Sequence, residues 1–200
     1  MSIGLRIEVK SEEVDAQLGR FMAGLTNREP MNELVRDRAR ELTRNHLVAI
    51  AETRHATAER LGAQPTGHWA QAAEKTTSEA DEEGATISIE QPGIGRAAHD
   101  VTIVPGGGKK YLTIPAIAAA YGKRAVTVPD LTVLIRWKDG ERRAVALIQA
   151  EGKPGAGTVW YWLVKSVFQP QDRSLLPSDE QYRLAALQGV REYVDQLLGE

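Results

Sequence analysis

The sequence contains no cysteine, so it has no disulfides, thiolate metal sites or cysteine nucleophiles. It also has no apolar run near the ~20 residues that a transmembrane helix needs. Residues 1–10 lack the basic start and the apolar block of a secretory leader. We therefore expect a protein that is made and kept in the cytosol, at least at first, without membrane contact.

A strong excess of charge of one sign is also absent. The formal net charge is −2 and the pI is about 6.1, which gives no general attraction to nucleic acid. A local basic lip that touches DNA in a channel is conceivable in the loops, but the overall acidity favours solvated loops. The four basic residues concerned are Lys109, Lys110, Lys123 and Arg124. With 200 residues, 42% of them hydrophobic, the chain is long enough for one good core, and we expect a single domain over 1–200.

The densest run of strand-forming residues lies at 131–168 and holds three of the four tryptophans. Apolar runs at 131–137 and 144–148 flank an Asp139-Gly140 pair, which is a strong hairpin signal. A third strand is expected at 158–168. Its apolar residues fill both faces, with Trp160 and Trp162 expected on the core side, so both faces need a cover. A partner subunit is one way to supply it.

Helical and strand patterns surround this central stretch. Alternating apolar residues predict a strand at 3–9, and Ser11 begins an amphipathic helix that ends near Thr26. A long helix is expected from about Pro30 to Leu61, where Gly62 terminates it. Ser178 and Gln181 form a capping box for a last helix.

Residues 63–110 have the weakest pattern and read as an insertion or flexible flap. We expect a short helix at 68–75 and short strands at 86–90 and 101–104. The order of the elements predicts an α+β fold. In that fold an antiparallel sheet is packed on one face by the long helix and the C-terminal helix.

One motif raises an enzymatic alternative. Asp130 follows Pro129 before the hairpin, and Glu151 and Lys153 follow it, in the order of a PD-(D/E)xK nuclease. In such enzymes the two carboxylates hold Mg²⁺ and the lysine assists the attacking water. The glycine and proline around Lys153 indicate a loop rather than a strand, which favours a structural hairpin over a metal site.

No other pattern predicts catalysis, a cofactor or a metal. The four histidines are scattered, and the helical pair His55 and Glu59 lacks a third ligand. The run Gly106-Gly107-Gly108-Lys109 lacks the spacing of a phosphate loop. We therefore expect no catalytic, cofactor-binding or metal-binding residues.

Two blocks carry a resemblance to a known family. The first is residues 112–122, Leu-Thr-Ile-Pro to Ala-Tyr-Gly, and the second runs from Val159-Trp160-Tyr161-Trp162 through 175–180 into the closing helix. Together with the opening strand and the amphipathic helices, they resemble the tailed-phage virion-morphogenesis family of neck and tail-completion proteins. The similarity touches most of the chain, and its motifs are packing residues.

The resemblance implies a structural virion protein without catalytic residues. It implies a long helix across an antiparallel sheet and a ring of identical subunits at the head-tail junction. The implied partners are other copies and the neck, connector or tail proteins, with DNA only passing through a channel. The implied location is the host cytoplasm during assembly and then the virion. Residues 63–110 are an addition relative to the simpler members.

Overall fold

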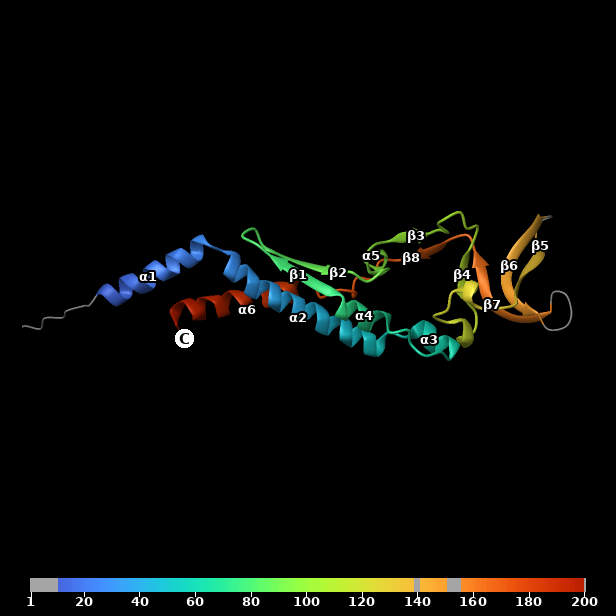
Figure 1. Ribbon diagram of the computed structural model, residues 1–200, viewed down its shortest axis with the longest axis horizontal. Helices are drawn as coiled ribbons and strands as arrows, with labels where there is room; N and C mark the ends of the chain where they lie inside the picture. Colours follow the sequence, from blue (N-terminus) through green and yellow to red (C-terminus); the bar gives the residue numbers. More distant parts are fainter. Residues whose placement is uncertain (1–10, 139–140, 151–155, 200) are drawn as a thin grey trace, which may run out of the picture. The chain divides into compact units, whose positions relative to one another are not determined.

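The computed structural model describes residues 11–138, 141–150 and 156–199, which divide into two compact units. The first unit draws on 1–46, 73–90 and 176–200, and the second on 47–72 and 91–175. The predicted α+β fold, with antiparallel sheets, a long helix and a C-terminal helix, is confirmed (Figure 1). The strand expected at 3–9 lies outside the described residues.

Three helices shape the first unit: α1 (Ser11–Thr26), α2 (Glu29–Thr53, which continues into the second unit) and α6 (Asp179–Leu198). The start of α6 is the predicted capping box. The Ser178 hydroxyl accepts a hydrogen bond from the Gln181 backbone N–H at 3.3 Å. The Gln181 side-chain oxygen accepts one from the Ser178 N–H at 2.8 Å. Two backbone donors at the helix start are thereby satisfied.

Helices α2 and α6 pack closely against each other within this unit. A β-carbon on Gly189 of α6 would lie only 2.7 Å from the backbone nitrogen of Val35, so glycine is what lets the two backbones approach. The hydroxyl oxygens of Thr43 and Tyr182 lie 2.9 Å apart. Arg38 donates to both carboxylate oxygens of Glu192, at 2.5 and 3.2 Å. A polar network therefore flanks the close helix contact.

A β-hairpin completes the first unit. Strands β1 (Thr76–Ala80) and β2 (Ala85–Ile89) pair antiparallel, after the short helix α4 (His68–Glu74) that the sequence predicts. The side chain of Asp81 accepts from two backbone N–H groups of the turn, and the Asn32 amide of α2 donates to the Asp81 carbonyl at 2.7 Å. Strand β1 was not predicted, because Thr-Thr-Ser-Glu-Ala has no apolar alternation.

The long helix expected from Pro30 to Leu61 is wrong in one respect, because it is two helices. Helix α2 ends at Thr53, and α3 spans Ala56–Leu61 after His55, whose backbone is not helical. Arg54, at the break, forms an ion pair with Asp172 and donates to the Ser174 carbonyl oxygen at 3.2 Å. These contacts stabilise the interruption between α2 and α3. No glycine or proline indicates this interruption in the sequence.

The second unit is built on a four-stranded antiparallel sheet in the order β4 (Leu112–Pro115), β7 (Gly157–Val164), β6 (Glu141–Ala150) and β5 (Leu131–Lys138). The predicted hairpin is the β5–β6 pair. The third strand is shorter than expected, because β7 ends at Val164. After Lys165 and Ser166 the chain enters β8 (Val167–Gln169), which pairs with β3 (Val101–Ile103) in a separate two-stranded sheet. The remaining elements are α5 (Ile94–Ala97) and two 3-10 turns, η1 (Ala118–Ala120) and η2 (Ala125–Thr127).

The prediction that Trp160 and Trp162 face the core is wrong for Trp162. Trp162 is 48% exposed, Trp160 is half-buried, and Tyr161 between them is only 1% exposed. The Tyr161 hydroxyl lies 3.3 and 3.2 Å from the carbonyl oxygens of Ala120 and Lys123, so its buried polar end is satisfied. The register between β6 and β7 shifts between Leu147 and Ile148, and a bulge of this kind changes which residues face inward.

Candidate functional site

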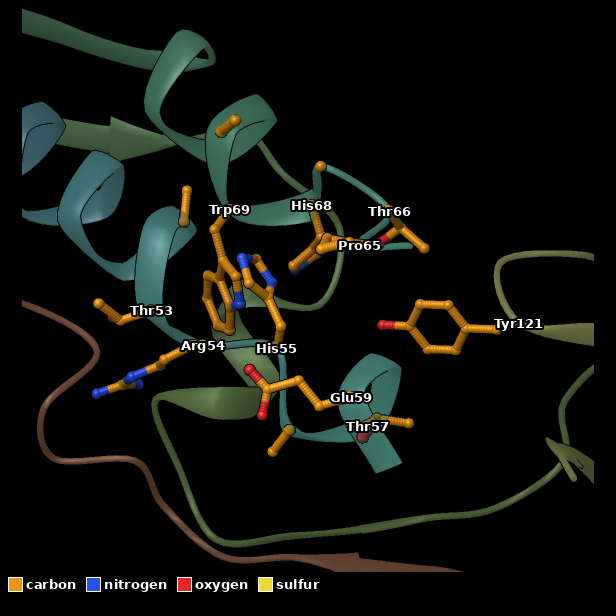
Figure 2. Close-up of a pocket in the computed structure, with 14 residues that line it drawn as sticks. Thr53, Arg54, His55, Thr57, Glu59, Pro65, Thr66, His68, Trp69 and Tyr121 are labelled. Atoms are coloured by element: carbon orange, nitrogen blue, oxygen red, sulfur yellow. The ribbon is translucent and has the colours of Figure 1, made fainter. Parts of the chain in front are cut away.

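The second unit contains a cavity of about 790 Å³ between the end of α2, α3 and the start of α4. Figure 2 shows His55, Trp69 and Glu59 gathered on one side of it and Tyr121 approaching from the other. Thr57, Thr66 and the backbone of Gly67 contribute further polar groups. The cavity is therefore lined by mixed polar and aromatic side chains.

His68 is the most constrained titratable group of this cavity. Its Nδ1 lies 3.2 Å from the Gln91 amide nitrogen, and its ring meets the Trp69 ring edge-on with centroids 5.1 Å apart. Burial lowers the pKa of His68, which favours the neutral ring. Because the Gln91 amide nitrogen can only donate, the unprotonated Nδ1 of a neutral His68 ring accepts this hydrogen bond. His68 is thereby held as a packing group.

The cavity lacks the ligand set of a metal centre. His55 and Glu59, the pair at helical spacing in the sequence, both line it. Across the parts of the chain that the structure describes, however, no three His, Asp or Glu side chains are grouped to hold a metal ion. Within the second unit, His55 and His68 both line the cavity, and His99 is exposed in the loop before β3. His46 lies on α2 in the first unit.

The nuclease alternative falls largely on residues outside the described ranges. Glu151 and Lys153 both lie there, and only Asp130 is described. Asp130 is exposed at the start of β5 with a backbone φ of +57°, a left-handed conformation that aspartate tolerates in turns. The motif stays a prediction. Mg²⁺-dependent DNA cleavage that Asp130→Ala and Glu151→Ala abolish together would establish it.

The basic residues of the sequence lie in two loops that flank β4. All four side chains, Lys109, Lys110, Lys123 and Arg124, are exposed. All four belong to the second unit, with Lys109 and Lys110 before β4 in the chain and Lys123 and Arg124 between η1 and η2. Their role in contacting DNA stays a prediction.

A second hollow, in the first unit, is a groove of about 470 Å³ between α2 and α6. Each helix lines it with four residues at the spacing i, i+3, i+4 and i+7, which is one face of a helix over two turns. From α2 these are Arg38, Glu41, Leu42 and Asn45, and from α6 they are Gln181, Leu184, Ala185 and Gln188. The groove is therefore lined by three apolar side chains, Leu42, Leu184 and Ala185, together with amide and charged groups.

Helix α1 presents an apolar stripe that the described residues leave uncovered. The stripe consists of Val14, Leu18, Met22 and Leu25, which are between 49% and 62% exposed. Helix α6 contacts α1 at Gly24, near the C-terminal end of α1 and beside the stripe. The Tyr193 hydroxyl donates to the Gly24 carbonyl oxygen at 3.2 Å, and a β-carbon on Gly24 would meet Leu197 at 2.7 Å. Leu184, Leu187 and Leu198 of α6 are also exposed.

Comparisons with protein-family models, with curated proteins and with solved structures found no match for this chain. In the described part of the chain, no helix is long and apolar enough to cross a membrane. The described residues form a polar cavity, an interhelical groove and several exposed apolar surfaces.

Proposed function

We propose that the chain is a structural protein of a tailed phage or prophage particle. In this proposal it is a neck or tail-completion component that assembles as a ring at the head-tail junction. The observation that carries the proposal is the uncovered apolar stripe of α1. Four large apolar side chains on one helix face, each about half exposed, are costly to leave in water and mark an interaction surface.

The sheet of the second unit supports the same proposal. Strand β5 is an edge strand that pairs with β6 alone among the described strands. Its residues Val133, Ile135 and Trp137 alternate along the strand and are 45–71% exposed. An edge strand with exposed apolar side chains readily accepts another chain. Each unit thus offers a surface for a neighbour, which suits a subunit that contacts both its copies and other particle proteins.

The proposed mechanism involves no chemistry on a substrate. Apolar side chains form the core of each interface and polar groups form its rim, and shape complementarity selects the partner. The partners are further copies of the chain and connector, neck or tail proteins. If DNA meets the protein at all, it does so only while it passes through the channel of the ring. The protein acts in the host cytoplasm during assembly and then in the virion.

Electron microscopy of the purified full-length protein tests this proposal. We expect closed rings of uniform diameter, formed alone or after addition of connector or tail-tube proteins. The matched control is Leu18→Asp, which places a charge in the centre of the stripe and should remove the rings while leaving the circular dichroism spectrum unchanged. Protein that stays monomeric in both conditions contradicts the proposal.

A further inference from the structure

The α1 stripe and the α2–α6 groove match each other in spacing and length. Three stripe residues, Leu18, Met22 and Leu25, follow the spacing i, i+4 and i+7, which is how an amphipathic helix places its anchors in a hydrophobic groove. The groove is lined over eight positions of each helix, 38–45 and 181–188. Eight helical positions span about 11 Å, and residues 18–25 span the same length.

The groove is suited to a third helix. Two helices packed side by side leave a furrow along their contact, and a further helix fits it by placing its ridge of side chains between theirs. Leu184, which lines the groove, is 53% exposed, so the described residues do not supply that cover. Among the lining residues only Arg38 and Glu41 are charged, and they form an ion pair at 3.2 Å. The lining therefore presents no net charge to an uncharged stripe.

The chain's own α1 is held away from its own groove. Asn27 and Arg28 alone separate α1 from α2, and the groove begins at Arg38, about 14 Å further along α2 at 1.5 Å per residue. The end of α1 is fixed at Gly24 by Tyr193 and Leu197, near the opposite end of α6 from Gln181 and Leu184. At 3.6 residues per turn Gly24 lies roughly 110° around the helix from the middle of the stripe. This anchor therefore leaves the stripe open.

We infer that α1 of one copy docks through Leu18, Met22 and Leu25 in the α2–α6 groove of a second copy. The inference rests on the ring proposed above and names the surfaces that join its subunits. The stripe and the groove are different surfaces, so the contact repeats head to tail from one copy to the next. Such a heterologous contact closes into a ring when its rotation closes.

Cysteine cross-linking tests the contact directly, because the natural chain has no cysteine. One full-length protein carries Leu18→Cys and the other carries Leu184→Cys, and the two are mixed and treated with a short bismaleimide. We expect a cross-linked species of one chain of each kind, at least tenfold more abundant than with Ala16→Cys in place of Leu18→Cys. Ala16 is exposed on the side of α1 opposite to the stripe, so it is the matched control.

The outcomes separate this contact from the proposed function. Rings without a Leu18–Leu184 cross-link above the Ala16 control overturn the inference and leave the ring standing. A dominant cross-link between two Leu18→Cys chains also overturns it, because it shows a symmetric α1 pair. A strong Leu18–Leu184 cross-link in open filaments supports the contact and contradicts the ring. A strict monomer without cross-links overturns both.

Discussion

The β-carbon that Gly189 lacks would lie 2.7 Å from the backbone nitrogen and 2.8 Å from the α-carbon of Val35. Both contacts are shorter than any real side chain tolerates, and both involve backbone atoms that cannot rotate away. Gly189 therefore sets the distance between α2 and α6, and with it the shape of the groove that these helices form.

Gly189→Ala should destabilise the first unit by about 1–3 kcal/mol, because overpacking forces the two helices apart. The overpacking cost should therefore outweigh the ~1 kcal/mol by which alanine stabilises a helix relative to glycine, so that the net effect is a loss of stability. Gly19→Ala on α1 is the control, since nothing lies within 4 Å of its β-carbon position and it should stabilise. Urea unfolding measures both. Equal stabilisation of the two variants would show that α2 and α6 do not approach this closely.

Ser178→Ala should cost about 1 kcal/mol, because it removes the acceptor that caps the start of α6. Ser78→Ala should be neutral or stabilising, since the buried Ser78 hydroxyl makes no hydrogen bond within the described residues. The two substitutions delete the same atom, so urea midpoints compare them directly. A larger loss at Ser78 than at Ser178 would contradict this assignment.

Asp172 should make stability depend on pH in the acid range. Burial alone would raise its pKa, but hydrogen bonds from Ser174 and the charge of Arg54 outweigh burial and lower the pKa. A lowered carboxyl pKa stabilises the fold above the unfolded-state value of roughly 4, and this contribution is lost as the pH falls through the folded-state pKa.

Asp172→Asn should therefore lower the urea midpoint at pH 7, and the difference from wild type should shrink as the pH falls below the unfolded-state value of roughly 4. The effect should be small, because the Asp172 side chain is 34% exposed and solvent screens the ion pair. Ser174→Ala should reduce the same pH dependence, because it removes the hydrogen bond from the Ser174 hydroxyl to Asp172 at 2.8 Å and keeps the one from the backbone N–H of the same residue. A difference that is constant from pH 3 to 7 would exclude the carboxylate as its source.

In the centre of β7, truncation of Trp162 should cost less stability than truncation of the smaller Tyr161. Tyr161→Ala should cost about 3–5 kcal/mol, because it empties a fully buried position and removes the hydroxyl that donates to the Ala120 and Lys123 carbonyl oxygens. Trp162→Ala should cost less than about 1.5 kcal/mol, since half of the indole is already in water. Thermal unfolding of both variants tests the order, and the reverse order would restore Trp162 to the core.

Local signals in the sequence were sufficient where a few adjacent residues determine the structure. The Asp-Gly pair predicted the β5–β6 hairpin, and Ser178 with Gln181 predicted the start of α6, because turns and caps depend on residues near in sequence. The break after α2 and the inward face of β7 were not predictable in this way. The first depends on Arg54 meeting Asp172, and the second on a register shift between two strands.

The candidate interface shows the same limit. The apolar stripe of α1 is visible in the sequence, but its exposure is not, because periodicity gives a face and not what covers it. The groove went unpredicted, although residues 38–45 and 181–188 share the spacing i, i+3, i+4 and i+7. That signal becomes informative only once α2 and α6 are known to pack against each other.

The mass of the purified protein in solution tests the central claim most directly. Each chain has a mass of 21.9 kDa. Sedimentation equilibrium of the protein alone over a wide concentration range should give one discrete multiple of this mass, and Leu18→Asp should return it to a single chain. With connector or tail-tube proteins added, the complex should contain several copies of the chain. A mass of 21.9 kDa for the natural sequence under all of these conditions would contradict assembly into a ring.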